Sequence, residues 1–82
     1  MDFVTKKCQK GAGFRIIPEK KNYESLMERI RSRIDQFDVE TKHLSVFHYK
    51  EKKVSVSRSG FLIVRDSSRE EARKVAESLL KD

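Results

Sequence analysis

The histidines, the cysteine and the carboxylates are the residue types in this chain that could carry catalysis or bind a metal. His43 and His48 flank the start of one apolar stretch, and their odd separation places them on opposite faces of a strand. Cys8 has no base near it in the sequence, and most carboxylates stand three or four positions from a basic residue, as helix-surface ion pairs do. The stretch "KGAG" lacks the spacing of a phosphate loop. We therefore expect a non-enzymatic protein with no metal and no cofactor.

The basic residues indicate a different chemistry. The chain has 19 Lys and Arg against 13 Asp and Glu, a net charge of +6. This balance suits an anionic partner and equally the solubility of a small domain. Several cations fall on strand ends and turns of one expected hairpin system, and we predict that they contact phosphates. These predicted nucleic-acid-binding residues are Lys50, Lys52, Lys53, Arg58 and Arg65. The nearby aromatics Phe47, Tyr49 and Phe61 either stack on bases or fill the core.

Length and composition set the class of protein. A chain of 82 residues with 37% apolar and 39% charged residues is one small domain with a densely charged surface. No apolar run has the length of a signal peptide core or a membrane span, so we expect a soluble, cytoplasmic protein without a membrane partner. Asparagine occurs once and glutamine twice among many Lys, Arg and Glu, which is a thermophile-like composition.

Two amphipathic helices and a few strands account for most of the chain. Apolar residues recur at helical spacing in "NYESLMERIRSRIDQF", where Asn22 is the expected N-cap. They recur again in "SSREEARKVAESLL", where Ser68 and Glu71 spell a capping box. The strand patterns are "GFRII", "LSVFHY", "VSVS" and "FLIVR", with a turn at Gly60. "FLIVR" is apolar on both sides, which indicates a central strand or one covered by a partner.

The order strand–helix–strand–strand–strand–helix predicts an α+β fold. We expect two layers, with an antiparallel sheet of about four strands and two helices on one face. Residues 13–82 form this domain, and residues 1–12 precede it as a segment that is either flexible or an edge strand. Strict alternation places Val54 and Val56 toward the core and Ser55 and Ser57 on the outer face.

From about residue 14 to residue 80 the chain resembles one half of a TATA-binding protein. The similarity is greatest in "VSVSRSGFLIVRDSSREEARKVAESLL", where an apolar strand, a small turn (Arg58 to Gly60), a second strand, a Ser-rich turn and a helix follow in the family's order. This resemblance implies the half-domain fold. Phe61 stands where the family usually has a basic residue after the turn glycine. Val56 and Ser57 stand where the family has its DNA-kinking phenylalanines.

The family carries two tandem halves, whereas this chain has one. The resemblance therefore implies either a homodimer that rebuilds the pair or an edge strand that pairs with another protein. The helix–three strands–helix order also resembles a double-stranded RNA-binding domain. That family places lysines at the start of its last helix, where this chain has Ser68, Arg69, Glu70 and Glu71.

From these features we expect a small binding domain whose partner is DNA or RNA, held by the basic hairpin surface. The alternative is an adaptor module that binds a protein partner or a second copy of itself through the sheet. Light scattering and salt-dependent titrations with DNA and RNA separate the two expectations.

Overall fold

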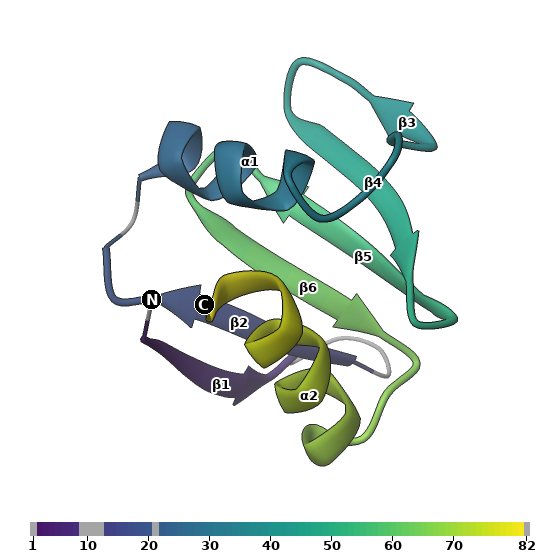
Figure 1. The fold of residues 1–82 in the computed structure, drawn as a ribbon. Helices are drawn as coiled ribbons and strands as arrows, with labels where there is room; N and C mark the ends of the chain where they lie inside the picture. Colours follow the sequence, from purple (N-terminus) through teal and green to yellow (C-terminus); the bar gives the residue numbers. More distant parts are fainter. Residues whose placement is uncertain (1, 9–12, 21, 82) are drawn as a thin grey trace.

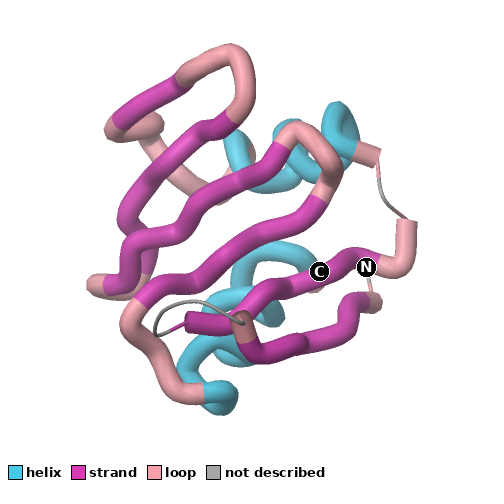
Figure 2. The backbone as a smooth tube through the Cα atoms, turned by 180° about the vertical axis from the view of Figure 1, so that it is seen from behind, coloured by secondary structure: helices cyan, strands magenta, loops and turns pink. Residues whose placement is uncertain are grey.

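The computed structural model describes residues 2–8, 13–20 and 22–81 and shows an α+β fold of one sheet and two helices. In chain order the elements are β1 (Phe3–Lys7), β2 (Gly13–Pro18), α1 (Tyr23–Arg31), β3 (Val39–Glu40), β4 (Leu44–Tyr49), β5 (Lys52–Ser57), β6 (Phe61–Arg65) and α2 (Arg69–Leu80). The described strands form one sheet in the order β1-β2-β6-β5-β4-β3, and every neighbouring pair is antiparallel. Both helices lie on one face of the sheet, and the view from behind shows the other face uncovered by either helix (Figures 1 and 2).

The sheet is larger than predicted, with six strands in place of about four. One additional strand is β1, which lies within the segment 1–12, takes the edge-strand alternative given for it, and pairs with β2 from Phe3↔Pro18 to Lys7↔Phe14. The other is β3, a two-residue edge strand that was not expected and that pairs with β4 at Val39↔Val46.

Local sequence signals account for the helix boundaries. The side chain of Asn22 accepts a hydrogen bond from the Ser25 N–H at the start of α1. Ser68 and Glu71 form the predicted capping box at the start of α2, which fixes that helix to the end of β6. The first helix is shorter than its apolar pattern suggested, because Ser32 ends it and Ile34 packs against the core from the following loop.

The core lies between the helices and the inner face of the sheet. Fully buried apolar side chains come from both layers, with Phe47, Val54, Val56 and Leu62 from the strands and residues such as Leu79 from α2. β6 is a central strand between β2 and β5, as its pattern predicted; its Leu62 and Val64 are fully buried toward the helices, whereas Phe61 and Ile63 are half-buried on the face that neither helix covers. No helix within the described ranges is long and apolar enough to cross a bilayer.

Candidate nucleic-acid interface

The register of the sheet decides which side chains occupy the uncovered face. Residues directly opposite one another in a ladder point to the same side, and Val54, Val56 and Leu62 point to the helices. The alternate residues therefore form the opposite side, which we call the open face. Its strand positions are Val4, Lys6, Arg15, Ile17, Val39, Leu44, Val46, His48, Lys53, Ser55, Ser57, Phe61, Ile63 and Arg65. None of the chain's 13 carboxylate side chains occupies an open-face position in these strands.

Four cations cross this face from strand to strand, and we call Lys6, Arg15, Lys53 and Arg65 the cation band. Lys6 lies opposite Arg15 in the β1–β2 ladder. Lys53 and Arg65 lie next to each other on β5 and β6, immediately outside the Val54↔Val64 pair. All four side chains are on exposed residues, and none makes an ion pair with another described residue. A row of cations without carboxylates raises the local concentration of anions.

An apolar band runs beside the cation band, and its members are Val4, Ile17, Val39, Leu44, Val46, Phe61 and Ile63. Val4 and Val39, on the two edge strands, are 55% and 50% exposed and are the described chain's exposed large hydrophobics. The Arg15 guanidinium lies 4.8 Å from the centre of the Phe61 ring, which joins the two bands by a cation–π contact.

A buried hydroxyl lies among these apolar side chains. Ser55 stands between Val46 and Ile63 in the ladders, and its Oγ is buried without a hydrogen-bond partner. A buried, unpaired polar group of this kind costs about 1–3 kcal/mol of folding free energy. The predicted outward direction of Ser55 and Ser57 agrees with the register.

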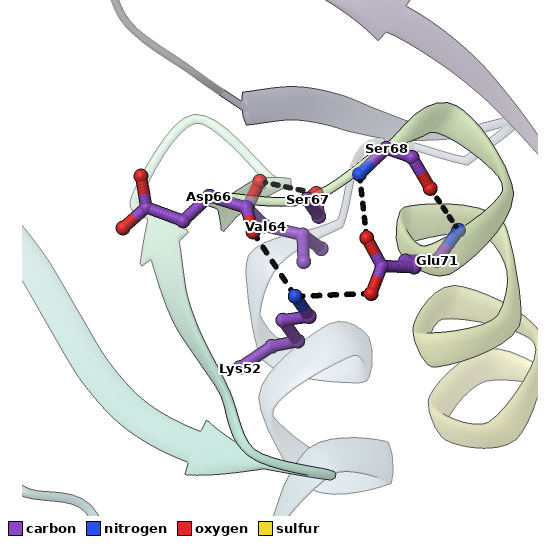
Figure 3. Close-up of polar contacts among 6 residues, drawn as sticks. All are labelled: Lys52, Val64, Asp66, Ser67, Ser68 and Glu71. Carbon is purple, nitrogen blue, oxygen red and sulfur yellow. Dashed lines mark hydrogen bonds and ion pairs between the residues drawn. The ribbon is translucent and has the colours of Figure 1, made fainter.

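The structure brings two of the five predicted phosphate-binding residues together on the open face, namely Lys53 and Arg65. Lys52, one residue earlier, shares the core side with Val54, and its side chain is only 23% exposed. Its Nζ donates to the Asp66 carbonyl at 3.0 Å and pairs with Glu71 Oε2 at 3.1 Å (Figure 3). Lys52 therefore ties β5 to the start of α2 and is committed to the fold.

The carboxylate of Glu71 joins this network to the helix cap. Its Oε1 accepts the Ser68 backbone N–H at 2.9 Å, and Ser68 Oγ accepts the Glu71 N–H at 3.2 Å (Figure 3). The backbone N–H of Ser68 lowers the pKa of the Glu71 carboxyl, and the Lys52 ammonium lowers it further. Ser67 Oγ donates to the Val64 carbonyl at 3.1 Å, so the β6–α2 turn is held at several points.

Lys50 and Arg58 occupy opposite ends of the β5 hairpins. Lys50 is in the β4–β5 turn, with its Nζ 5.9 Å from the centre of the Tyr49 ring. Arg58 is in the β5–β6 turn, with its guanidinium 5.1 Å from the centre of the Tyr23 ring at the start of α1. The intervening strand is about 20 Å long, so one compact phosphate site cannot include both residues. Gly60 in that turn has a φ of 93°, as a chain reversal requires.

The aromatics separate between the two faces. Phe47 is fully buried in the core, and the hydroxyl of Tyr49 lies 2.6 Å from Ser78 Oγ on α2. Only Phe61 of these three is on the open face, half-buried under Arg15. It is therefore the one aromatic of the predicted set in a position to contact a ligand on this face.

Lys6 and Arg15 were absent from the predicted binding set. Their positions depend on the β1–β2 pairing, a register between segments that no local pattern defines. Alternation within "FRII" does not reveal which side of β2 faces the helices, because Phe14 and Ile16 are apolar and so is Ile17. Only the pairing of β1 with β2 places Lys6 directly opposite Arg15, on the same side of the sheet.

The remaining polar clusters serve the fold. His48 Nδ1 pairs with an Asp38 carboxylate oxygen, whereas His43 precedes β4 and its backbone N–H donates to Thr41 Oγ1. Arg29 and Arg33 donate to the Leu80 and Ser78 carbonyls at the end of α2, where cations favour the helix dipole. These two arginines therefore join the end of α1 and the loop after it to the end of α2. Among the described residues, no three His, Cys, Asp or Glu side chains gather closely enough to hold a metal ion.

Comparison with known proteins gives this chain no relatives. No family model, no curated protein and no solved structure matches it. The resemblance to half of a TATA-binding protein therefore stays an expectation from the sequence, and the argument for function depends on the geometry of the open face.

Proposed function

We propose that this protein is a non-enzymatic nucleic-acid-binding domain that uses the open face of its sheet. The observation that carries the proposal is the cation band, four exposed cations on the face that neither helix covers. No strand position of the open face carries a carboxylate, and the one carboxylate shown to contact an open-face side chain is that of Asp38, which pairs with His48 at the β4 end of the face. An anionic partner therefore meets attraction on the open face and mixed charge on the helical side.

The expected affinity follows from the number of cations in the band. Each phosphate neutralised by a Lys or Arg releases condensed counterions, and the slope of log K against log salt is about −0.7 per contact for a single strand. Four contacts give a slope of about −2.8, so affinity falls about 50-fold between 50 and 200 mM salt. For a duplex the slope is about −3.6.

A matched pair of variants tests whether the open face, and not the overall charge, does the binding. The first variant, K53Q/R65Q, removes two cations from the cation band. The control, R73Q/K74Q, removes two cations from α2, whose exposed side chains make surface pairs at 3.7 and 3.8 Å. Both variants carry a net charge of +4, from +6 less 2.

Fluorescence anisotropy with labelled 12-nucleotide DNA and RNA, single-stranded and duplex, measures affinity at several salt concentrations. We expect K53Q/R65Q to weaken binding and to make the salt slope shallower by about 1.4, since two phosphate contacts are lost. The control keeps the wild-type slope. Equal losses in both variants, or no binding at 50 mM salt, would contradict the proposal.

A second candidate function is binding to a protein or to a second copy of this chain through the sheet. The exposed Val4 and Val39 on the two edge strands favour it, because edge strands and apolar patches are common association sites. Light scattering measures the self-association arm directly. A mass near 9.7 kDa at all concentrations argues against a homodimer.

A further inference from the structure

The position of the apolar band beside the cation band indicates which form of nucleic acid the open face fits. This inference rests on the proposed function. On β2, Arg15 belongs to the cation band and Ile17 to the apolar band, two residues further along the same side of the strand. Such positions are about 7 Å apart. A ligand that reaches both must be charged along one side and apolar along the other.

The two bands cross the strands instead of running along them. Lys6 and Arg15 lie opposite each other on β1 and β2. Arg15 is opposite Ile63, so the cation band shifts by two residues along β6 to Arg65, and it continues to Lys53 on β5. The apolar band extends from Val4 on one edge strand to Val39 on the other and is interrupted on β5, where Ser55 and Ser57 occupy the corresponding positions. With strands about 4.8 Å apart, the six-stranded face is about 24 Å wide. The cation band spans four of these strands, about 14 Å, so it contacts a short stretch of backbone.

We infer that the ligand is a single strand of DNA or RNA that crosses the β-strands, with its phosphates on the cation band and its bases on the apolar band. One base stacks on Phe61, whose ring already has the Arg15 guanidinium at 4.8 Å. Stacking of this kind is indifferent to base identity, because every base has a π-face. The face therefore binds with little sequence preference.

A base-paired duplex cannot contact the cation band with its phosphates and the apolar band with its bases at the same time. Its bases are paired and stacked inside, and its outer surface offers sugar and phosphate to a flat sheet. The apolar band would then be covered by polar groups, with half-buried Phe61 and Ile63 gaining no apolar partner. Unpaired bases supply that partner, so the same cations bind a single strand with additional apolar contact.

Replacing the ring at position 61 tests the inference. F61L keeps an apolar side chain on β6, whereas F61W keeps an aromatic ring. Anisotropy is measured with a 12-nucleotide single strand in DNA and RNA forms and with the matching duplex, after circular dichroism has shown each variant folded. We expect F61L to weaken single-strand binding by about 5- to 150-fold, the range for one stacked base. F61W keeps a ring for the base to stack on and should retain the wild-type affinity. Duplex affinity stays unchanged in both variants.

The outcomes separate this inference from the proposed function. Duplex binding equal to or tighter than single-strand binding, or an F61L variant with wild-type affinity for the single strand, would overturn the inference alone, provided K53Q/R65Q still weakens binding. Failure of every nucleic acid to bind at 50 mM salt overturns both. Saturable binding of an acidic amphipathic peptide, with none of the single strand, assigns the same face to a protein and also overturns both.

Discussion

Lys52 and Lys53 are adjacent lysines on β5 whose side chains point to opposite sides of the sheet, so the same substitution should have opposite consequences. Lys52 donates to the Asp66 carbonyl and pairs with Glu71, whereas Lys53 has no ion-pair partner among the described residues. Methionine replaces either side chain with an uncharged one of similar length. K52M therefore tests the fold, and K53M tests the binding face.

The magnitudes follow from the contacts. A hydrogen bond from a charged donor contributes about 1.5–3 kcal/mol, and the partial exposure of Lys52 reduces this, so K52M should lower the free energy of unfolding by about 1–2 kcal/mol. For a domain of this size that corresponds to a fall in Tm of about 5–15 °C. K53M should leave stability within about 0.5 kcal/mol of wild type. It should make the single-strand salt slope shallower by about 0.7.

Urea denaturation followed by circular dichroism and anisotropy titration at 50 and 200 mM salt measure the two quantities on both variants. We expect K52M to be less stable than wild type with an unchanged salt slope. K53M should keep the wild-type stability and have a shallower salt slope. If K52M loses as much of the slope as K53M while keeping its stability, Lys52 contacts the ligand and the side assigned to it is wrong.

Two further substitutions test the fold near the same hairpin. The pKa of Glu71 is lowered in the folded state, so its contribution to stability is complete above the unfolded pKa near 4.5 and is lost as the pH falls through the lowered folded value. E71Q should therefore give a shallower loss of stability below pH 4.5, and an unchanged acid-denaturation profile would contradict this. Glu51 has a φ of 66° in the β4–β5 turn. E51G should raise the free energy of unfolding by about 1 kcal/mol in urea titrations, and no gain would show that the turn stores no strain.

The sequence predicted the layers, the caps and most strand positions, because those depend on local periodicity. It also contained more information about the site than the predicted set used. Val54 was placed toward the core, and strict alternation then requires Lys52 on the same side and Lys53 on the other. Grouping the two lysines in one phosphate surface ignored that rule.

Non-local pairing accounts for what the sequence could not supply. The side that Arg15 occupies follows from the β2–β6 register, which joins residues about 50 positions apart. The two-residue strand β3 is too short to show any period, so only its pairing with β4, at Val39↔Val46, identifies it as a strand. The open face, with its cation band on four strands and its apolar band on five, is therefore a property of the assembled sheet, and no single segment displays it.

The charges of the helical layer and those of the open face differ in what they do for folding. Arg29 and Arg33 meet carbonyls at the end of α2, and Arg31 pairs with Glu40 at 3.0 Å. These cations stabilise the contacts between elements. The cation band lacks such partners, and like charges in one row repel each other and oppose compaction at low ionic strength. Folding alone gives no reason to gather four unpaired cations on one face, whereas a polyanion that covers the face would offset the repulsion among them.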